Sequence, residues 1–408
     1  MTVVAPDLQF NRKPVPGANL RAATARRLFV RAVERLPGRP LSVRRPDGEL
    51  LVQGAEGSAE LHIRRDAFFR RLGADGKIGF GEAYMAGDWD AVGDLAAVLE
   101  PFAANLERLV PAPLQRLRRF FEPRLPDSQR NTVQGAARNI RRHYDLSNEL
   151  FALFLDETMT YSCAIFEPGD TLADAQRRKL RAMAELAGVA SGHRVLEIGS
   201  GWGAMAVHLA VTYGCPVTTI TVSPEQAEFA RRRVAAAGVD DLVDVQLCDY
   251  RDVTGRFDRI VSIEMFEAVG ERYWGQFFAA CDRLLAPGGR LALQTITMPH
   301  RRYRASRGSY TWIHKYIFPG GLIPSVEAVE AAAARGSALR LSHRVEIGQH
   351  YAPTLRAWRG RFADRREQVL EQGFGEEFIR MWELYLAYCE AGFATARLGD
   401  VQLTLERG

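Results

Sequence analysis

A glycine-rich turn is the first feature of this sequence that could do chemistry. The segment VLEIGSGWG (195–203) has the pattern of a strand end, a tight turn and a helix start. Gly199, Gly201 and Gly203 permit such a turn and let a ligand approach the backbone closely. Glu197 stands inside the motif, and the Lys-Ser/Thr pair of a P-loop is absent. The motif therefore predicts a nucleoside-binding site at the end of a parallel strand.

Polar residues stand where the next two predicted strands end. Thr221 to Gln226 follow the second strand, and Cys248-Asp249-Tyr250 follow the third. Because the carboxyl ends of parallel strands meet at one edge of a sheet, these side chains suit an adenosine bound over the turn. The combination resembles class I S-adenosylmethionine-dependent methyltransferases. A dinucleotide-binding enzyme would share the turn and is the alternative.

The elements that would position this site form an alternating pattern from residue 176 onward. Strands are expected at 193–198, 216–221, 242–248, 257–263, 289–297, 338–347 and 400–406. Helices are expected at 202–213, 224–237, 272–284, 325–335 and 353–396, the last broken near Gly373. Seven strands with crossover helices predict an α/β fold with a doubly wound, Rossmann-like sheet. The segment 298–324, rich in aromatic residues and arginine, is too long for a turn and predicts a lid insertion.

The N-terminal third predicts a second, small α+β domain. Its expected elements are a helix at 20–36, a hairpin at 41–54 around Pro46-Asp47-Gly48, a strand near 59–64, and helices at 66–73 and 92–109. A linker is expected where Pro111, Pro113, Pro123 and Pro126 fall among charged residues. The predicted organisation is an N-terminal domain with linker at 1–125 and a catalytic domain at 126–408.

Composition excludes several classes of protein. Of 408 residues, 47% are apolar and 25% are charged, which is globular composition. No run approaches the roughly 18 apolar residues of a membrane span, and the N-terminus does not have the pattern of a signal peptide. Five scattered cysteines without a C-x-x-C pair favour a reducing cytoplasm, and eight histidines without ligand spacing predict no metal site.

Basic charge is concentrated toward the N-terminus. Residues 1–142 carry 24 Lys and Arg against 16 Asp and Glu, whereas the remainder carries 30 against 33. This asymmetry suggests an anionic partner, either a membrane leaflet or nucleic acid. Only four of the 54 basic residues are lysine, so a compositional bias toward arginine explains it equally well. The lid arginines, Arg301, Arg302, Arg304 and Arg307, could meet lipid head groups or simply be solvated.

Further blocks resemble the cyclopropane-fatty-acid synthase family of S-adenosylmethionine-dependent methyltransferases, over roughly residues 40–395. They are RRHYDLSNELF (141–151), MTYSCAIF (159–166), EMFEAVG (264–270), KYIFPGGLIPS (315–325) and HYAPTLRAW (350–358). GFGEAYMAGDWD (79–90) resembles the extra domain of members that act on phospholipid acyl chains. FLDETMTYSCAIF, QTITMPH and MWELYLAYCEAGF resemble the actinobacterial members that begin 10-methylstearic (tuberculostearic) acid synthesis.

The resemblance implies roles for individual residues at the cofactor, S-adenosylmethionine. From its methionine end to its adenine, the implied contacts are Tyr161 and Ser162, then Gly199, Gly201 and Gly203 with Glu197, then Thr221 and Gln226 at the ribose, Asp249 and Tyr250 at the adenine, and Ile263 along the ring.

The family's bicarbonate-binding set falls on Cys163, Glu267, the backbone of Ile296, and Tyr351. Gln294 stands where the family usually has histidine; it can donate to a carbonate oxygen but cannot take up a proton near neutral pH. Glu264 and Ala268 replace a frequent glycine and a frequent histidine. From residue types alone, Glu267 could be a helix N-terminal residue and Cys163 a small buried apolar residue.

The chemistry that the resemblance implies is methyl transfer to a cis alkene, which leaves a carbocation. The site must exclude water, and aromatic faces stabilise a cation. Candidates for the channel lining are Phe266, Tyr303, Tyr316 and Phe318, each of which could equally be a core residue. A hydride shift and proton loss would give a methylene branch, whereas ring closure would give cyclopropane.

The sequence thus predicts a C-methyltransferase that converts oleoyl chains of phospholipids to the 10-methylene precursor of 10-methylstearic acid, which a flavin-dependent reductase would saturate. Cyclopropane formation is the alternative. A small-molecule or nucleic-acid methyltransferase would share the fold, but SIEMFEAVG (262–270) replaces the Asn-Pro-Pro-Tyr-type block of nucleic-acid enzymes. A non-catalytic lipid-binding protein is a further class. We expect a cytoplasmic protein on the inner membrane face and, as in many family members, a homodimer.

Overall fold

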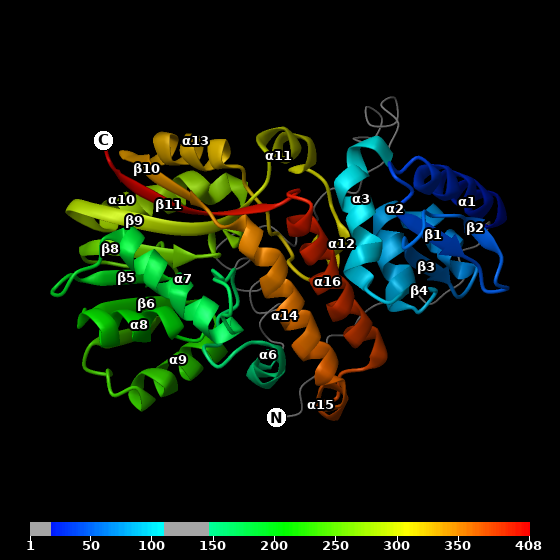
Figure 1. The fold of residues 1–408 in the computed structure, drawn as a ribbon. Coiled ribbons are helices and arrows are strands. Elements are labelled where there is room, and N and C mark those ends of the chain that lie inside the picture. Colours follow the sequence, from blue (N-terminus) through cyan, green and yellow to red (C-terminus); the bar gives the residue numbers. More distant parts are fainter. Residues whose placement is uncertain (1–17, 110–146) are drawn as a thin grey trace. The chain divides into compact units, whose positions relative to one another are not determined.

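The computed structural model describes residues 18–109 and 147–408 (Figure 1). The predicted linker prolines and the first six residues of the block at 141–151 lie outside these ranges. The chain divides into two compact units. The first comprises Met1–Arg124, Ser309–Ile317 and Trp358–Arg397, and the second comprises Leu125–Gly308, Phe318–Ala357 and Leu398–Gly408. Both units draw on separated stretches of chain, whereas the sequence predicted one boundary after residue 125.

The second unit is built on a seven-stranded sheet in the order β10-β11-β9-β8-β5-β6-β7 (Figure 1). Its strands are β5 (Val195–Ile198), β6 (Val217–Thr221), β7 (Val243–Leu247), β8 (Phe257–Ile263), β9 (Leu285–Thr297), β10 (Leu339–Glu346) and β11 (Gly399–Arg407). Strands β5 to β9 pair in parallel, and β11 runs antiparallel between β9 and β10. All seven predicted strands are confirmed. The direction of β11 was not predicted, because a local hydrophobic pattern does not encode it.

Helices cover both faces of this sheet, as a doubly wound fold requires. Helices α7 (Leu172–Ala187), α8 (Ala204–Tyr213) and α9 (Pro224–Ala236) share one core with Val195, Val261 and Ala292. Helices α10 (Trp274–Leu284) and α13 (Val326–Gly336) share the other with Leu196, Ile260 and Leu293. Each residue of the first set is next in sequence to one of the second, as Val195 is to Leu196, because successive side chains of a strand point to opposite faces of the sheet. Among the described residues, this unit also contains α6 (Asn148–Phe154) and α11 (His300–Ser306).

The first unit holds a four-stranded sheet in the order β2-β1-β3-β4. Its strands are β1 (Leu41–Arg44), β2 (Leu50–Val52), β3 (Ala59–Ile63) and β4 (Trp89–Val92). Its helices are α1 (Ala18–Glu34), α2 (Ala67–Met85), α3 (Leu95–Leu109), α12 (Trp312–Tyr316), α15 (Arg366–Glu371) and α16 (Glu376–Ala394). Helix α14 (Tyr351–Asp364) begins in the second unit and ends in the first. The predicted α+β character and the hairpin at 41–54 are confirmed, and the break near Gly373 separates α15 from α16.

Candidate active site

A cavity of about 170 Å³, open to solvent, lies at the carboxyl ends of β5, β6, β7 and β8, within the second unit. Its wall includes ten of the eleven predicted cofactor residues: Tyr161, Ser162, Glu197, Gly199, Gly201, Thr221, Gln226, Asp249, Tyr250 and Ile263. Segments far apart in the sequence thus meet at the edge of the sheet where such folds bind nucleosides. The roles assigned to individual residues stay predictions.

The glycine-rich turn after β5 has the backbone conformation that its sequence predicted. Gly199 has φ +99°, and a Cβ there would lie 3.2 Å from the Cβ of Met265. Gly203, the eleventh predicted residue, precedes α8 with φ +86° and lies against Ala230 rather than on the cavity wall. Both positions therefore require glycine, one beside the cavity and one for helix packing.

Glu197 is a buried carboxyl beneath the cavity. Its Oε2 accepts a 2.6 Å hydrogen bond from the Thr219 hydroxyl. Burial raises the pKa of Glu197 to about 8, against the opposing effects of that hydrogen bond and of the Lys179 charge. Near neutral pH this carboxyl therefore favours its protonated form, which offers hydrogen-bonding oxygens rather than a full negative charge at the cavity wall.

The ribose and adenine side of the wall is held by contacts within the chain. The Thr221 hydroxyl donates to Gln226 Oε1 at 2.8 Å. Asp249 accepts from the backbone N–H of Arg251 at 3.0 Å and from its Nε at 2.7 Å. Tyr250 packs edge to face against Phe277, with ring centroids 5.4 Å apart. These contacts position the side chains along the cavity wall.

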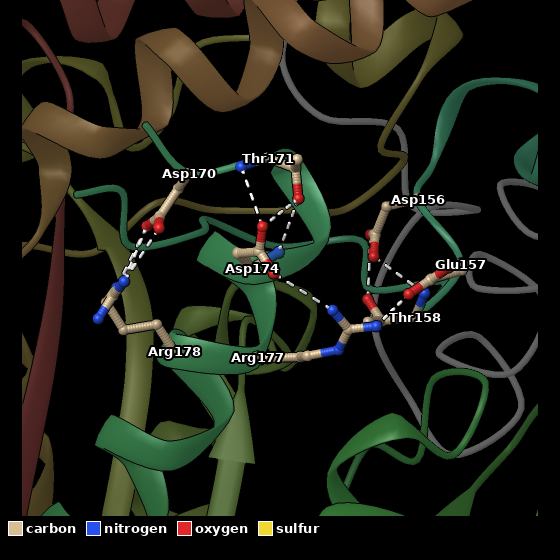
Figure 2. Close-up of polar contacts among 8 residues, drawn as sticks. All are labelled: Asp156, Glu157, Thr158, Asp170, Thr171, Asp174, Arg177 and Arg178. Atoms are coloured by element: carbon tan, nitrogen blue, oxygen red, sulfur yellow. Dashed lines mark hydrogen bonds and ion pairs between the residues drawn. The ribbon is translucent and has the colours of Figure 1, made fainter. Parts of the chain in front are cut away.

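The loop that carries Tyr161, Ser162 and Cys163 is anchored around the start of α7 (Figure 2). Figure 2 shows Arg177 paired with both Glu157 and Asp174, Arg178 paired with Asp170, and a turn in which Asp156 accepts from Thr158. It also shows Thr171 and Asp174 capping the helix reciprocally. These contacts fix both ends of the loop, so that its middle can form the cavity wall.

Lys179 is a buried lysine that the sequence analysis missed. Its Nζ donates to Ser162 Oγ at 2.6 Å. Burial lowers the pKa of Lys179 to about 8, although neighbouring acidic groups, Glu264 first among them, oppose the shift. It stands on the buried stripe of α7, four residues from both Ala175 and Met183. A lone lysine within an apolar helical stripe was the signal available in the sequence.

Three of the five predicted catalytic residues converge on Glu264, which follows β8. Glu264 Oε1 accepts from the backbone N–H of Cys163 at 2.8 Å and from Gln294 Nε2 at 2.9 Å. Its Oε2 accepts from the Tyr351 hydroxyl at 2.5 Å. Glu264 also lines the cavity and has φ +48°, which is unusual for a residue other than glycine.

The other two predicted residues contact each other. Glu267 Oε1 accepts from the backbone N–H of Ile296 and, at 2.9 Å, from the Thr295 hydroxyl. Its buried Oε2 has no hydrogen-bond partner among the described residues. Burial, and secondarily the charge of Glu264, raises the pKa of Glu267 to about 8. Near neutral pH this carboxyl therefore favours its protonated form.

Two further groups around Glu264 also favour their neutral forms. Cys163 is fully buried, and burial raises the pKa of its thiol well above the ordinary value. Asp400 is equally buried beyond Gln294, and burial raises its pKa well above the ordinary value, with Glu264 adding to the effect. Asp400 was not singled out in the sequence, where it begins a strand with no chemical motif.

The four predicted channel residues are absent from the described wall of this cavity. Phe266 is fully buried and packs on Trp274 in the core. Tyr303 is also buried, and its hydroxyl donates to Glu271 at 2.6 Å. Tyr316 belongs to the first unit and Phe318 to the second. Their assignment to a substrate channel stays a prediction.

The residues present fit S-adenosylmethionine. Gly199 brings the backbone of the turn to the cavity wall, polar side chains there suit an adenosine, and the Glu264 carboxyl lines a cavity that would hold a sulfonium cation. Together with a seven-stranded sheet whose β11 is antiparallel, this site defines a class I S-adenosylmethionine-dependent methyltransferase.

Residues 131–403 match the family model described as mycolic acid cyclopropane synthetase, and the chain belongs to this family. It is 48% identical over 404 residues to the tuberculostearic acid methyltransferase UfaA1 of Mycobacterium tuberculosis, covering 96% of this chain and 93% of that protein. It is 35% identical over 348 residues to the cyclopropane-fatty-acyl-phospholipid synthase of Escherichia coli, covering 85% and 86%. These matches confirm the predicted family.

Among solved structures, the mycolic acid cyclopropane synthase CmaA1 complexed with SAH and CTAB matches with a TM-score of 0.62 and 32% identity, over 66% of this chain and 97% of that one. The predicted fold class, enzyme class and S-adenosylmethionine dependence are thereby confirmed. Within the described residues, no group of three or more His, Cys, Asp or Glu side chains could hold a metal ion. No described helix is long and apolar enough to cross a membrane.

Proposed function

We propose that this enzyme methylates the cis double bond of unsaturated phospholipid acyl chains and forms the 10-methylene precursor of 10-methylstearic acid. The observation that carries the proposal is the 48% identity, over 96% of the chain, to a protein named tuberculostearic acid methyltransferase. The 35% identity to a cyclopropane-fatty-acyl-phospholipid synthase makes ring formation the second candidate.

In this proposal S-adenosylmethionine, when bound, supplies an electrophilic methyl group on a sulfonium. The chain's own part is to hold the alkene beside that methyl, exclude water from the cation and accept a proton. Tyr303, Tyr316, Phe318 and, from the core, Phe266 are proposed to support the apolar channel. An anion at the donors of Cys163, Gln294 and Tyr351 accepts the proton. Bicarbonate is the anion that the family resemblance implies; Glu264 is a carboxylate that the chain supplies.

The remaining partners are proposed on charge and product chemistry. The excess of basic residues over 1–142 supports peripheral binding to the anionic, cytoplasmic face of a membrane, where the lipid substrate lies. A methylene branch has to be reduced to become a methyl branch, which supports a flavin-dependent reductase as the next enzyme. A homodimer remains part of the proposal by family resemblance alone.

The test supplies the purified enzyme with methyl-labelled S-adenosylmethionine and dioleoyl phospholipid vesicles. The labelled acyl chain is then examined by NMR, because methylene and cyclopropane products have the same mass. Exomethylene signals are expected. Cyclopropane signals would establish the second candidate instead, and label absent from lipid would overturn both. Distearoyl vesicles, which offer no alkene, are the matched control, and binding to anionic against neutral vesicles tests the membrane contact.

A further inference from the structure

We infer that Glu264 is the general base of this active site, the group that takes the proton from the methylated acyl chain. The inference rests on the proposed alkene methylation and adds a catalytic residue to it. Glu264 lies immediately after β8 and lines the cavity between Ile263 and Met265, which also form its wall. A base must be able to reach the reacting carbon, and Glu264 is on the side of the cluster that opens to the cavity.

Glu264 accepts hydrogen bonds from three donors, the arrangement that a protein uses to bind a small anion. Its two oxygens accept from the backbone N–H of Cys163, the amide of Gln294 and the hydroxyl of Tyr351, at 2.5 to 2.9 Å. Three fixed donors around one carboxylate hold it in place and match its ionised form. The same three residues belong to the set that the family resemblance implies for bicarbonate, together with Glu267 and the backbone of Ile296. These donors already form hydrogen bonds to the Glu264 carboxylate. A bicarbonate ion at the same place would therefore lack donors and would lie next to another carboxylate.

The acidic groups around Glu264 add little negative charge of their own near pH 7. On the neighbouring elements, Glu267, Asp400 and the Cys163 thiol all have pKa values raised by burial, so they favour neutral forms near pH 7. Lys179 is the cation whose field acts on this cluster. Glu267 is the less suitable base, because its Oε1 is turned toward Thr295 and Ile296 and the residue is not on the described cavity wall.

The backbone at Glu264 is a second, independent observation. Its φ of +48° lies in the left-handed region, which glycine adopts freely and glutamate does not. Strained residues persist where the surroundings hold them, and they concentrate at active sites. Here the strain directs the side chain into the donor set while its backbone N–H still donates to the Gln294 carbonyl at 2.9 Å. The position is thus occupied by a carboxylate despite a backbone that favours glycine.

The π pair of the alkene forms the bond to the transferred methyl carbon while the carbon–sulfur bond breaks and its electrons stay on sulfur. A hydride then shifts from the methylated carbon to the adjacent cationic carbon, which moves the positive charge to the branch point. The electron pair of one methyl C–H bond forms the exocyclic double bond, and the proton goes to a Glu264 oxygen. The acid returns the proton to water after the product leaves.

The experiment compares the native sequence with Glu264→Gln and Glu264→Gly in bicarbonate-depleted buffer at one pH. Glutamine keeps the size of the side chain but is a far weaker base, and glycine fits the backbone while opening the anion position. We expect the native enzyme to keep its turnover without bicarbonate and Glu264→Gln to lose about 100-fold or more. Added bicarbonate restores turnover to Glu264→Gly alone, because only that variant has both free donors and space.

Binding is measured separately from turnover. Calorimetry with S-adenosylhomocysteine shows whether each variant retains a folded cofactor site. Line broadening of ¹³C-bicarbonate in NMR shows which protein binds the anion: Glu264→Gly is expected to bind it, and the native sequence is not. Native turnover that requires bicarbonate, a bicarbonate signal with the native sequence, or full turnover by Glu264→Gln would each overturn the inference. If no protein methylates lipid, the proposed function fails, and the NMR comparison still decides the place of Glu264.

Discussion

Replacing Glu267 with glutamine should make the protein's stability less dependent on pH. Burial raises the pKa of this carboxyl from 4.5 to about 8, so the folded state binds the proton more tightly than the unfolded chain. Stability from this group is present at low pH and is lost as pH rises from about 4.5 toward 8. The slope is at most about 1.4 kcal/mol per pH unit, or on the order of 3 kcal/mol between pH 5 and 7.5. Glutamine resembles the protonated acid at all these pH values and lacks that loss.

The measurement is urea unfolding at several pH values from 5 to 7.5, followed by tryptophan fluorescence. At pH 5 the Glu267→Gln variant and the native sequence should have similar stability, and the variant should become the more stable of the two as pH rises. Glu185→Gln, at an exposed position on α7, is the matched control and should follow the native curve. Parallel curves for Glu267→Gln and the native sequence would show that this carboxyl is not held neutral by burial.

Three further changes test other parts of the site. Burial lowers the pKa of Lys179 from 10.5 to about 8, so native stability should rise by up to about 1.4 kcal/mol per pH unit between pH 8 and 10, and urea unfolding of Lys179→Met should lack that rise. Gly199→Ala combines φ +99° with a 3.2 Å contact to Met265; it should lower stability by about 1–3 kcal/mol and weaken S-adenosylhomocysteine binding in calorimetry. Thr171→Ala removes the reciprocal cap with Asp174 and should lower stability by about 1 kcal/mol. It should leave that binding unchanged, since Thr171 is outside the described cavity wall.

The fold was predictable wherever local patterns carry the information. Hydrophobic runs located every strand of the large sheet, but α7 was missed because Gln176 and Lys179 are polar residues on its buried face. The helix expected at 66–73 ends earlier than α2, which continues to Met85 through a segment with several glycines. A Cβ at Gly81 would lie 2.5 Å from the Trp312 side chain, so this glycine serves close packing within the first unit. Patterns based on polarity or turn propensity do not reveal such tertiary requirements.

The candidate site was predictable in part for the same reason. The glycine-rich turn is a local motif, and the cavity wall formed around it as expected. The partners of Glu264 come from residues 101, 30 and 87 positions away along the chain. The family resemblance marks Glu264 as a replacement for a frequent glycine. Only the folded chain shows that its carboxylate accepts hydrogen bonds from Cys163, Gln294 and Tyr351.

Glu264 and Glu267 are nearby carboxyls whose surroundings differ in hydrogen-bond donors and in burial. Glu264 faces the cavity, and three donors match the lone pairs of its ionised form. The Oε2 atom of Glu267 is buried, and burial raises the pKa of this carboxyl to about 8, which favours the neutral acid. A neutral acid does not repel a neighbouring carboxylate, whereas two buried negative charges in one cluster would oppose each other. The donors of Cys163, Gln294 and Tyr351 thus surround the carboxylate that we propose as the base, while burial keeps the neighbouring Glu267 in its acid form.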